Sequence, residues 1–326
     1  MQPLRTELRV PTADFSIGPD DGILSVGSCF ADRMGQRLAD LKFPATVNPF
    51  GVIYHPLALH RLLRAAATGT PPTEAGYLHR DDCWVHRHFH SEHHADTRDE
   101  LAVRLARTLR DVGRDLPTRR VLLLTWGTAW GYRRRADGEL VANCHREPSA
   151  DFEKVLTPVD AVVDDARRVL NALRRVSPEL RVVLTVSPVR HVRDGLPENG
   201  VSKATLRLAA HTLAASLPGV HYFPSYELMV DDLRDYRFYG ADLVHPTPTA
   251  EAYLWEQFDR VYLSEAARRF AADWTELRRA LDHRPFRPEG EAHQRFLRKL
   301  LTRLESLAER MDVSAEVAAV RAQLRT

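Results

Sequence analysis

Short apolar runs rich in β-branched residues alternate along the chain with longer segments whose apolar residues recur at helical spacing. The runs predict buried strands over 23–27, 45–48, 121–125, 181–186 and 220–224. The longer segments predict helices over 31–43, 56–67, 97–112, 158–176 and 202–217. Strand and helix in alternation predict an α/β fold with a mainly parallel sheet between helices, whose active site lies at the carboxyl ends of the strands.

The pattern changes near the end of the chain and becomes almost wholly helical from Ala250 onward. The 326 residues exceed the usual size of one domain, which leaves room for an appendage. We therefore expect a main α/β domain over residues 1–262 and a helical C-terminal extension over 263–326. This extension either packs on the main domain or serves to form a homo-oligomer.

The first strand runs directly into a helix at Gly27-Ser28-Cys29. Gly27 permits a tight turn, and Ser28 then sits where a strand ends and the free N–H groups of a helix begin. Ser28 is the candidate nucleophile, although a serine here also suits an ordinary helix cap. Cys29 is the weaker candidate for two reasons. The turn can present only one of two neighbouring side chains to the site, and cysteine more often serves as a small buried residue.

A second chemical element is the sequence Asp242-Leu243-Val244-His245-Pro246. A carboxylate three residues before a histidine can hold one ring nitrogen while the other points outward. His245 is then a candidate general base and Asp242 its orienting group. The bland alternative is a structural pair that holds a loop.

Charge and composition narrow the range of partners. The formal net charge of +2 comes from 46 basic and 44 acidic residues mixed along the sequence, so no field of one sign is present to bind nucleic acid or a membrane surface. We expect a small-molecule or glycan substrate. The first residues lack the apolar core of a secretory signal, no run reaches membrane-spanning length, and three cysteines are too few for a disulfide framework, so we expect a cytoplasmic location.

A group of histidines lies within residues 83–94. The alternating order over 83–90 predicts a strand with one histidine face. Imidazole suits zinc, but no closed set of ligands at regular spacing accompanies the histidines, so a solvated strand face is favoured over a metal site. The histidines in this group are His86, His88, His90, His93 and His94.

Several segments together resemble a known family. The sequence Gly27-Ser28-Cys29-Phe30-Ala31 matches the motif that names the GSCFA family, which is similar to the SGNH, or GDSL-like, hydrolases. Further segments that look like family motifs are 48–51, 127–130, 143–145, 187–191, 202–203 and 242–246. The resemblance implies a three-layer, flavodoxin-like α/β/α sandwich with a serine esterase site that needs no cofactor.

Carried over residue by residue, the resemblance makes Ser28 the nucleophile, His245 the general base and Asp242 its orienting residue. The reaction would be hydrolysis of an O-acyl ester through an acyl-enzyme, with acetyl on a carbohydrate or small metabolite as the expected group. Related hydrolases use an asparagine in the third motif for the oxyanion, and residues 127–130 contain none. Gly51 and Asn143 are therefore the expected donors beside the N–H of Ser28, with Asn48 and Thr128 as alternatives to Asn143.

Polar and aromatic residues after the strand ends are expected to contact the substrate. These are Asn48, Trp130, His90, Arg190, His191 and Lys203. Three alternatives to the esterase stay open: a non-hydrolytic acyltransferase, a ligand-binding relative, and a metal-dependent protein that uses His86 to His94.

Overall fold

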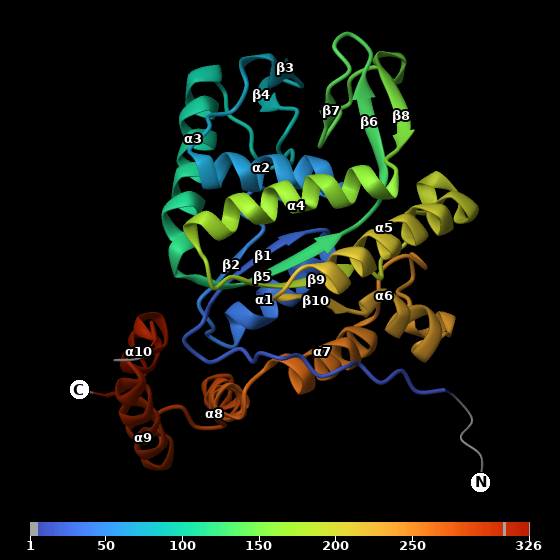
Figure 1. Ribbon diagram of the computed structural model, residues 1–326. Helices are drawn as coiled ribbons and strands as arrows, with labels where there is room; N and C mark the ends of the chain where they lie inside the picture. Colours follow the sequence, from blue (N-terminus) through green and yellow to red (C-terminus); the bar gives the residue numbers. More distant parts are fainter. Residues whose placement is uncertain (1–5, 309–310, 326) are drawn as a thin grey trace.

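The computed structural model describes residues 6–308 and 311–325 and has a five-stranded sheet at its centre (Figure 1). The strand order is β10-β9-β5-β1-β2, and every neighbouring pair is parallel. The bounds are β1 Gly22–Gly27, β2 Ala45–Val47, β5 Arg119–Trp126, β9 Arg181–Val186 and β10 Val220–Phe223. The predicted strands and the mixed α/β class are confirmed.

Helices connect these strands, close to where their sequence patterns predict them. Thr97 caps the third helix in a capping box with Glu100, which explains its sharp start. The bounds are α1 Cys29–Asp40, α2 Pro56–Thr68, α3 Arg98–Asp115, α4 Val159–Val176, α5 Leu196–Ser216, α6 Ser225–Glu227 and α7 Pro248–Tyr262. A π-helical segment, Leu228–Leu233, follows α6 and was not predicted.

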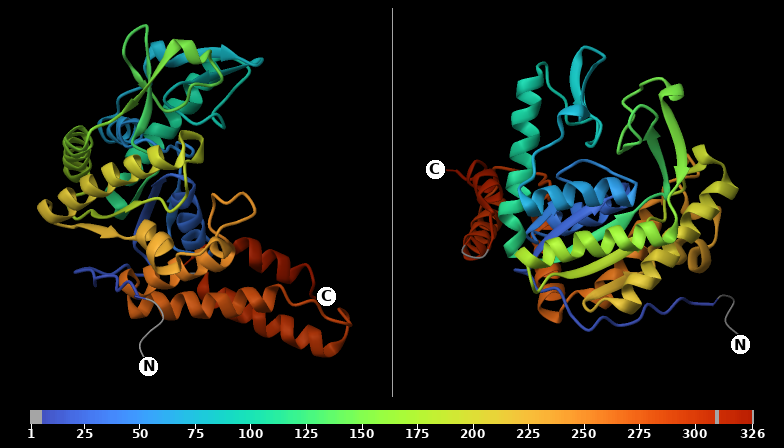
Figure 2. Two further views of the ribbon diagram at one scale, coloured as in Figure 1. Left: turned by 90° about the vertical axis from the view of Figure 1, so that its right-hand side faces the viewer. Right: turned by 45° about the horizontal axis from the view of Figure 1, so that its top comes forward.

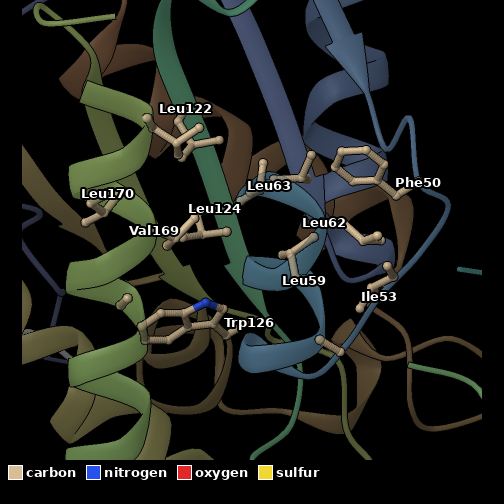
Figure 3. Close-up of a cluster of buried hydrophobic side chains, with 14 of the residues drawn as sticks. Phe50, Ile53, Leu59, Leu62, Leu63, Leu122, Leu124, Trp126, Val169 and Leu170 are labelled. Atoms are coloured by element: carbon tan, nitrogen blue, oxygen red, sulfur yellow. The ribbon is translucent and has the colours of Figure 1, made fainter. Parts of the chain in front are cut away.

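Both faces of the sheet are covered, because successive side chains of each strand point to opposite sides. On β5, Leu122 and Leu124 belong to a core shared with α2, α3, α4 and α5 (Figure 3). Val121 and Leu123 on the same strand belong to a second core, formed with α1, α7 and the start of α8. The continuous apolar runs of the central strands therefore reflect burial on two sides.

Two insertions rise together from the sheet (Figure 2). One is the antiparallel hairpin of β3 Tyr77–Arg80 and β4 Cys83–His86. The other is an antiparallel sheet of β6 Trp130–Arg134, β7 Leu140–Val141 and β8 Phe152–Leu156. Within this sheet, β6 lies between β7 and β8.

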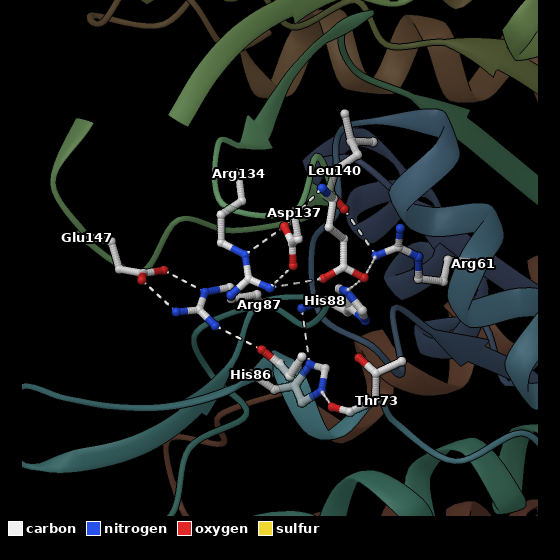
Figure 4. A network of polar contacts seen from close by, with 11 residues as sticks. Arg61, Thr73, His86, Arg87, His88, Arg134, Asp137, Leu140 and Glu147 are labelled. Carbon is white, nitrogen blue, oxygen red and sulfur yellow. Dashed lines mark hydrogen bonds and ion pairs between the residues drawn. The ribbon is translucent and has the colours of Figure 1, made fainter. Parts of the chain in front are cut away.

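The insertions are joined to each other by a polar network (Figure 4). Arg87 follows β4, and its guanidinium makes two bonds to the Glu147 carboxylate at 2.7 and 2.6 Å. The Arg87 carbonyl also accepts the N–H groups of Ala142 and Asn143. The two insertions thus form one unit, which we call the cap.

The C-terminal segment forms α8 Glu265–Leu281, α9 Glu291–Leu307 and α10 Ser314–Arg321 around a core of its own. It also packs on the sheet domain, where the Trp274 indole donates to the Asp40 carbonyl at 2.8 Å. Ala267 belongs to the core under the sheet and Trp274 to the C-terminal core, so α8 joins the two. Within the described ranges, no helix has the length and apolar character needed to cross a bilayer.

The strand order locates the switch point of the sheet. From β1 the chain moves to β2 on one side, and it then returns to β5 on the other side of β1. The direction of winding therefore reverses between β1 and β5, and the carboxyl ends beside such a reversal are the usual place for ligands in open α/β sheets.

Candidate functional site at the carboxyl edge of the sheet

The turn that links β1 to α1 lies at this switch point and requires glycine. Gly27 has φ of +134°, and a Cβ built there would lie 2.0 Å from the carbonyl oxygen of Thr125 on β5. The Gly27 N–H donates to Oδ1 of Asn48 at 2.9 Å, and the Ser28 N–H donates to the Thr125 carbonyl at 3.1 Å. The turn is thus fixed to both neighbouring strands.

Gly27→Ala is expected to destabilise the protein by about 3 kcal/mol or more, because it combines an unfavourable φ with a backbone clash. Gly138→Ala is the matched control, since Gly138 has φ of +72° and no atom within 4 Å of the added Cβ. The control is expected to cost only about 1 kcal/mol. Urea unfolding monitored by circular dichroism measures both values, and equal losses in the two variants would contradict the role assigned to the close approach.

Ser28 occupies the cap position of α1. Its side chain is completely buried, and its Oγ accepts the Phe30 N–H at 3.3 Å. The helix amino terminus favours negative charge at this position. The capping role expected as the bland alternative is therefore present, and it is compatible with a nucleophilic role.

Cys29 has the chemistry of a buried thiol. Burial is the largest influence on this group and raises its pKa, while the charge of Lys203 acts in the opposite direction. A raised pKa keeps the sulfur protonated and makes it a poor nucleophile at neutral pH.

Asp242 and His245 form the expected pair. Oδ2 of Asp242 lies 2.6 Å from Nδ1 of His245, while Oδ1 accepts the backbone N–H groups of Val244 and His245 at 2.9 and 3.0 Å. These hydrogen bonds, led by the one from the ring, lower the pKa of Asp242 to about 2. The His245 side chain is 54 % exposed, and no residue of the described ranges lies within hydrogen-bond distance of its Nε2.

The segment that carries this pair is attached to the loop after β9. The Arg190 N–H donates to the Val244 carbonyl at 3.4 Å. The Arg190 guanidinium lies 4.0 Å from the ring centre of Tyr239 and 5.0 Å from that of Tyr236. Arg190, predicted to contact substrate, thus anchors the His245 segment at the carboxyl edge of the sheet.

His191 lies between this segment and the loop after β2. Its ring packs edge-on against Tyr54 at 5.1 Å, and its Nε2 is buried with no hydrogen-bond partner among the described residues. Burial lowers the pKa of His191 to about 4, assisted by the charges of Lys203 and His245. The Tyr54 carbonyl in turn accepts the N–H groups of Gly127 and Thr128 after β5.

Ser28 and the Asp242–His245 pair thus lie at one edge of the sheet, but the structure does not join them. Within the described ranges there is no hydrogen bond between Oγ of Ser28 and the His245 ring. The hydroxyl is instead bound to the start of α1, and the imidazole faces solvent.

The expected oxyanion donors are partly occupied in this conformation. The Ser28 N–H is bound to Thr125, and the Gly51 N–H donates to the Asn48 carbonyl at 2.8 Å. Oδ1 of Asn143 accepts the His145 N–H at 2.8 Å, and its amide nitrogen has no partner among the described residues. The roles of Gly51 and Asn143 stay predictions.

Three further residues that we expected to contact the substrate instead contact other parts of the protein. Asn48 is buried, and its side chain holds the Gly27 turn. The Trp130 indole donates to the Glu198 carbonyl at 3.1 Å, and Lys154 lies 4.7 Å above its ring. His90 is partly exposed beside Gly51, where its Nδ1 lies 3.5 Å from Glu92.

Lys203 differs most from the surface contact that we expected. It is fully buried in α5, and its Nζ donates to the carbonyls of Gly127 at 2.8 Å and Ser187 at 2.7 Å. Ser202, whose role was missed, accepts the Ala129 N–H at 2.7 Å. A signal was present in the sequence, because Lys203 shares one helical stripe with the buried residues Leu206, Ala210 and Leu213.

The predicted solvated strand of histidines is wrong. β4 ends at His86, and both His86 and His88 are buried inside the cap. Nε2 of His86 lies 3.1 Å from the Thr73 carbonyl, and Nε2 of His88 lies 3.0 Å from Oε1 of Glu139 (Figure 4). Across the described residues, no group of three or more histidine, cysteine, aspartate or glutamate side chains is placed to hold a metal ion.

The fold and this site define an α/β protein with a parallel sheet, a serine turn at its switch point and an aspartate–histidine pair at the same edge. The GSCFA family model matches residues 22–258, and the chain therefore belongs to the GSCFA family. A model described as "GSCFA domain protein, C-terminal domain" matches residues 274–326. No curated protein matches the chain.

Proposed function

We propose that this GSCFA-family protein is a serine esterase that hydrolyses an O-acyl ester of a carbohydrate or small metabolite. The observation that carries the proposal is the Asp242–His245 pair at 2.6 Å with a free ring nitrogen. This pair is anchored at the edge of the sheet where Ser28 follows β1. A carboxylate, an imidazole and a hydroxyl are the three groups that acyl transfer by this route requires.

The proposed fold type is a three-layer, SGNH-like and flavodoxin-like α/β/α sandwich. Support comes from the strand order, which reverses at β1, and from helices on both faces of the sheet. The nucleophile would then occupy the switch point, where the chemistry of such folds is concentrated.

In the proposed reaction, the Ser28 hydroxyl exchanges its bond with the Phe30 N–H for one with Nε2 of His245. The proton moves to Nε2 as Oγ bonds to the ester carbon, and Asp242 stabilises the resulting imidazolium. The leaving alcohol takes that proton as its C–O bond breaks. Water then attacks the acyl-enzyme, loses a proton to His245, and releases the acid as Ser28 regains its proton.

Negative charge on the substrate oxygen would be stabilised chiefly by the amino terminus of α1. The first helical hydrogen bond runs from the Asp32 N–H to the Ser28 carbonyl, so the N–H groups before Asp32 are not taken up by the helix ladder. Asn143 can add its free amide. A developing oxyanion is the species that such preorganised donors stabilise most.

A non-hydrolytic acyltransferase is the second candidate, and the burial of Ser28 favours it. A side chain with no exposed surface is shielded from bulk water, which would allow an alcohol other than water to accept the acyl group. Rapid formation of an acyl-enzyme with slow hydrolysis, accelerated by added sugar alcohols, would identify this activity.

A fluorophosphonate probe tests the proposal directly. We expect the probe to label Ser28 in the wild-type protein, as read by mass spectrometry of the labelled peptide, because His245 can activate the hydroxyl. The Ser28→Ala variant should remain unlabelled, and a chelator should not change the labelling of the wild type. A wild-type protein that takes up no probe, or takes it up at Cys29, would exclude a Ser28 nucleophile.

A further inference from the structure

Lys203 is a buried cation with no counter-ion. Two of its three N–H groups are used by the carbonyls of Gly127 and Ser187, and the Tyr226 ring centre lies 5.8 Å from Nζ. No described carboxylate lies within ion-pair distance of it. An uncompensated buried ammonium is costly, so its presence at a strand edge calls for a function.

The two carbonyls place this charge at the carboxyl edge of the sheet. Gly127 follows β5 and Ser187 follows β9, so Nζ bridges the carboxyl ends of adjacent strands. Ser202, the preceding residue of α5, fixes the same turn through the Ala129 N–H. The side chain is therefore rigidly held at the edge that carries the Ser28 turn.

The charge acts on both halves of the proposed site. Burial raises the pKa of the Cys29 thiol, next to Ser28, and the charge of Lys203 opposes that rise. Burial lowers the pKa of His191, and the charge of Lys203 adds to that decrease. Cys29, His191 and Tyr226 are the titratable groups that face Lys203 from α1, from the loop after β9 and from α6. None of these is an acid ionised at neutral pH, so nothing nearby neutralises the charge.

We propose that Lys203 is a positioning residue of the acyl-transfer site, which holds the ends of β5 and β9 beside the Ser28 turn and stabilises negative charge that develops there. The inference rests on the proposed esterase function. A fixed cation in a low-dielectric site acts strongly on a developing oxyanion, and it takes over the task of the asparagine that residues 127–130 lack.

This role predicts a particular dependence on pH. Burial lowers the pKa of Lys203 to about 7, so the positive charge is lost as the pH rises above neutrality. Labelling of wild-type Ser28 by a fluorophosphonate should therefore decrease about tenfold between pH 7 and pH 9. Lys203→Arg keeps the charge at all these pH values and should move the decrease beyond pH 10.

The variant Lys203→Met removes the charge at every pH and should therefore label slowly throughout. Its labelling rate at pH 6.5 should be about 10- to 100-fold below that of the wild type, and the decrease above pH 7 should be absent. Lys299→Met removes an exposed lysine from α9 and should keep the wild-type rate and profile. Thermal melting of each variant establishes that it is folded.

The outcomes separate the two proposals. If wild-type Ser28 is not labelled at any pH, the esterase proposal itself is wrong. If it is labelled but the rate does not decrease between pH 7 and pH 9, the role of Lys203 is overturned by the wild type alone, even should Lys203→Met fail to fold. A folded Lys203→Met with the wild-type rate would overturn it as well.

Discussion

Ser28→Ala is expected to lower kcat/KM for aryl acetates and acetylated sugars by at least about 1,000-fold, which corresponds to about 4 kcal/mol of transition-state stabilisation. The variant loses the atom that bonds to the acyl carbon, and water in the site cannot replace it. It should remain folded, because removal of a helix cap costs only about 1 kcal/mol. Initial rates on a panel of esters measure the loss.

Two matched variants make this result specific. Ser25→Ala removes another buried hydroxyl from β1, which donates to the Ala31 carbonyl at 2.8 Å, and it should keep wild-type turnover. Asp242→Asn retains an oxygen for the N–H groups of Val244 and His245 but cannot accept from Nδ1, so turnover should fall by about 100-fold or more. Full activity in Ser28→Ala, or equal losses in Ser25→Ala, would exclude the proposed nucleophile.

The folded protein is expected to lose stability steeply in mild acid. Burial lowers the pKa of His55, His86 and His88 to about 3 each. Between pH 6 and pH 4 these rings bind protons in the unfolded chain but not in the folded one, so stability falls as the pH falls. Each ring contributes about 1.4 kcal/mol per pH unit well below pH 6.5, and the three together contribute about 4 kcal/mol per pH unit.

Urea unfolding at pH 7, 6 and 5 measures this dependence. His55→Gln removes one buried ring, whose Nε2 bonds to Thr157 at 2.9 Å, and should reduce the slope by about 1.4 kcal/mol per pH unit. The exposed His79→Gln should keep the wild-type slope. A free energy of unfolding that is constant from pH 7 to pH 5 would show that these histidines are protonated in the folded state.

Local sequence patterns predicted the strands and helices of the α/β domain and the contact between Asp242 and His245. The strand before Ser28 and the helix after it can be predicted because the spacing of apolar residues changes from that of a buried strand to that of a helix. This change lies within about twenty residues, so it can be read from the local sequence. The Asp242–His245 pair is local as well, because its members are three residues apart on one turn. The sequence thus predicted contacts between residues that are close to each other along the chain.

The failures all concern contacts between distant segments. Alternation over 83–90 predicts a strand, but the backbone turns after His86 because residues 139–147 of the other insertion pack against it. The Asn48 side chain goes to Gly27, twenty-one residues earlier, and Lys203 to Gly127, seventy-six residues earlier. A single sequence does not distinguish a polar residue that contacts a ligand from one that bonds to the end of a strand.

The ion pair between Arg87 and Glu147 limits which segments around the proposed site can move. Each insertion is tied to the other by charged groups that are largely withdrawn from water, so neither can swing away without leaving an unpaired ion behind. The His245 segment, by contrast, is exposed and held to the β9 loop by one long backbone bond and the stacked Arg190. We therefore expect that Ser28 becomes accessible through movement of the His245 segment, while the cap stays in place.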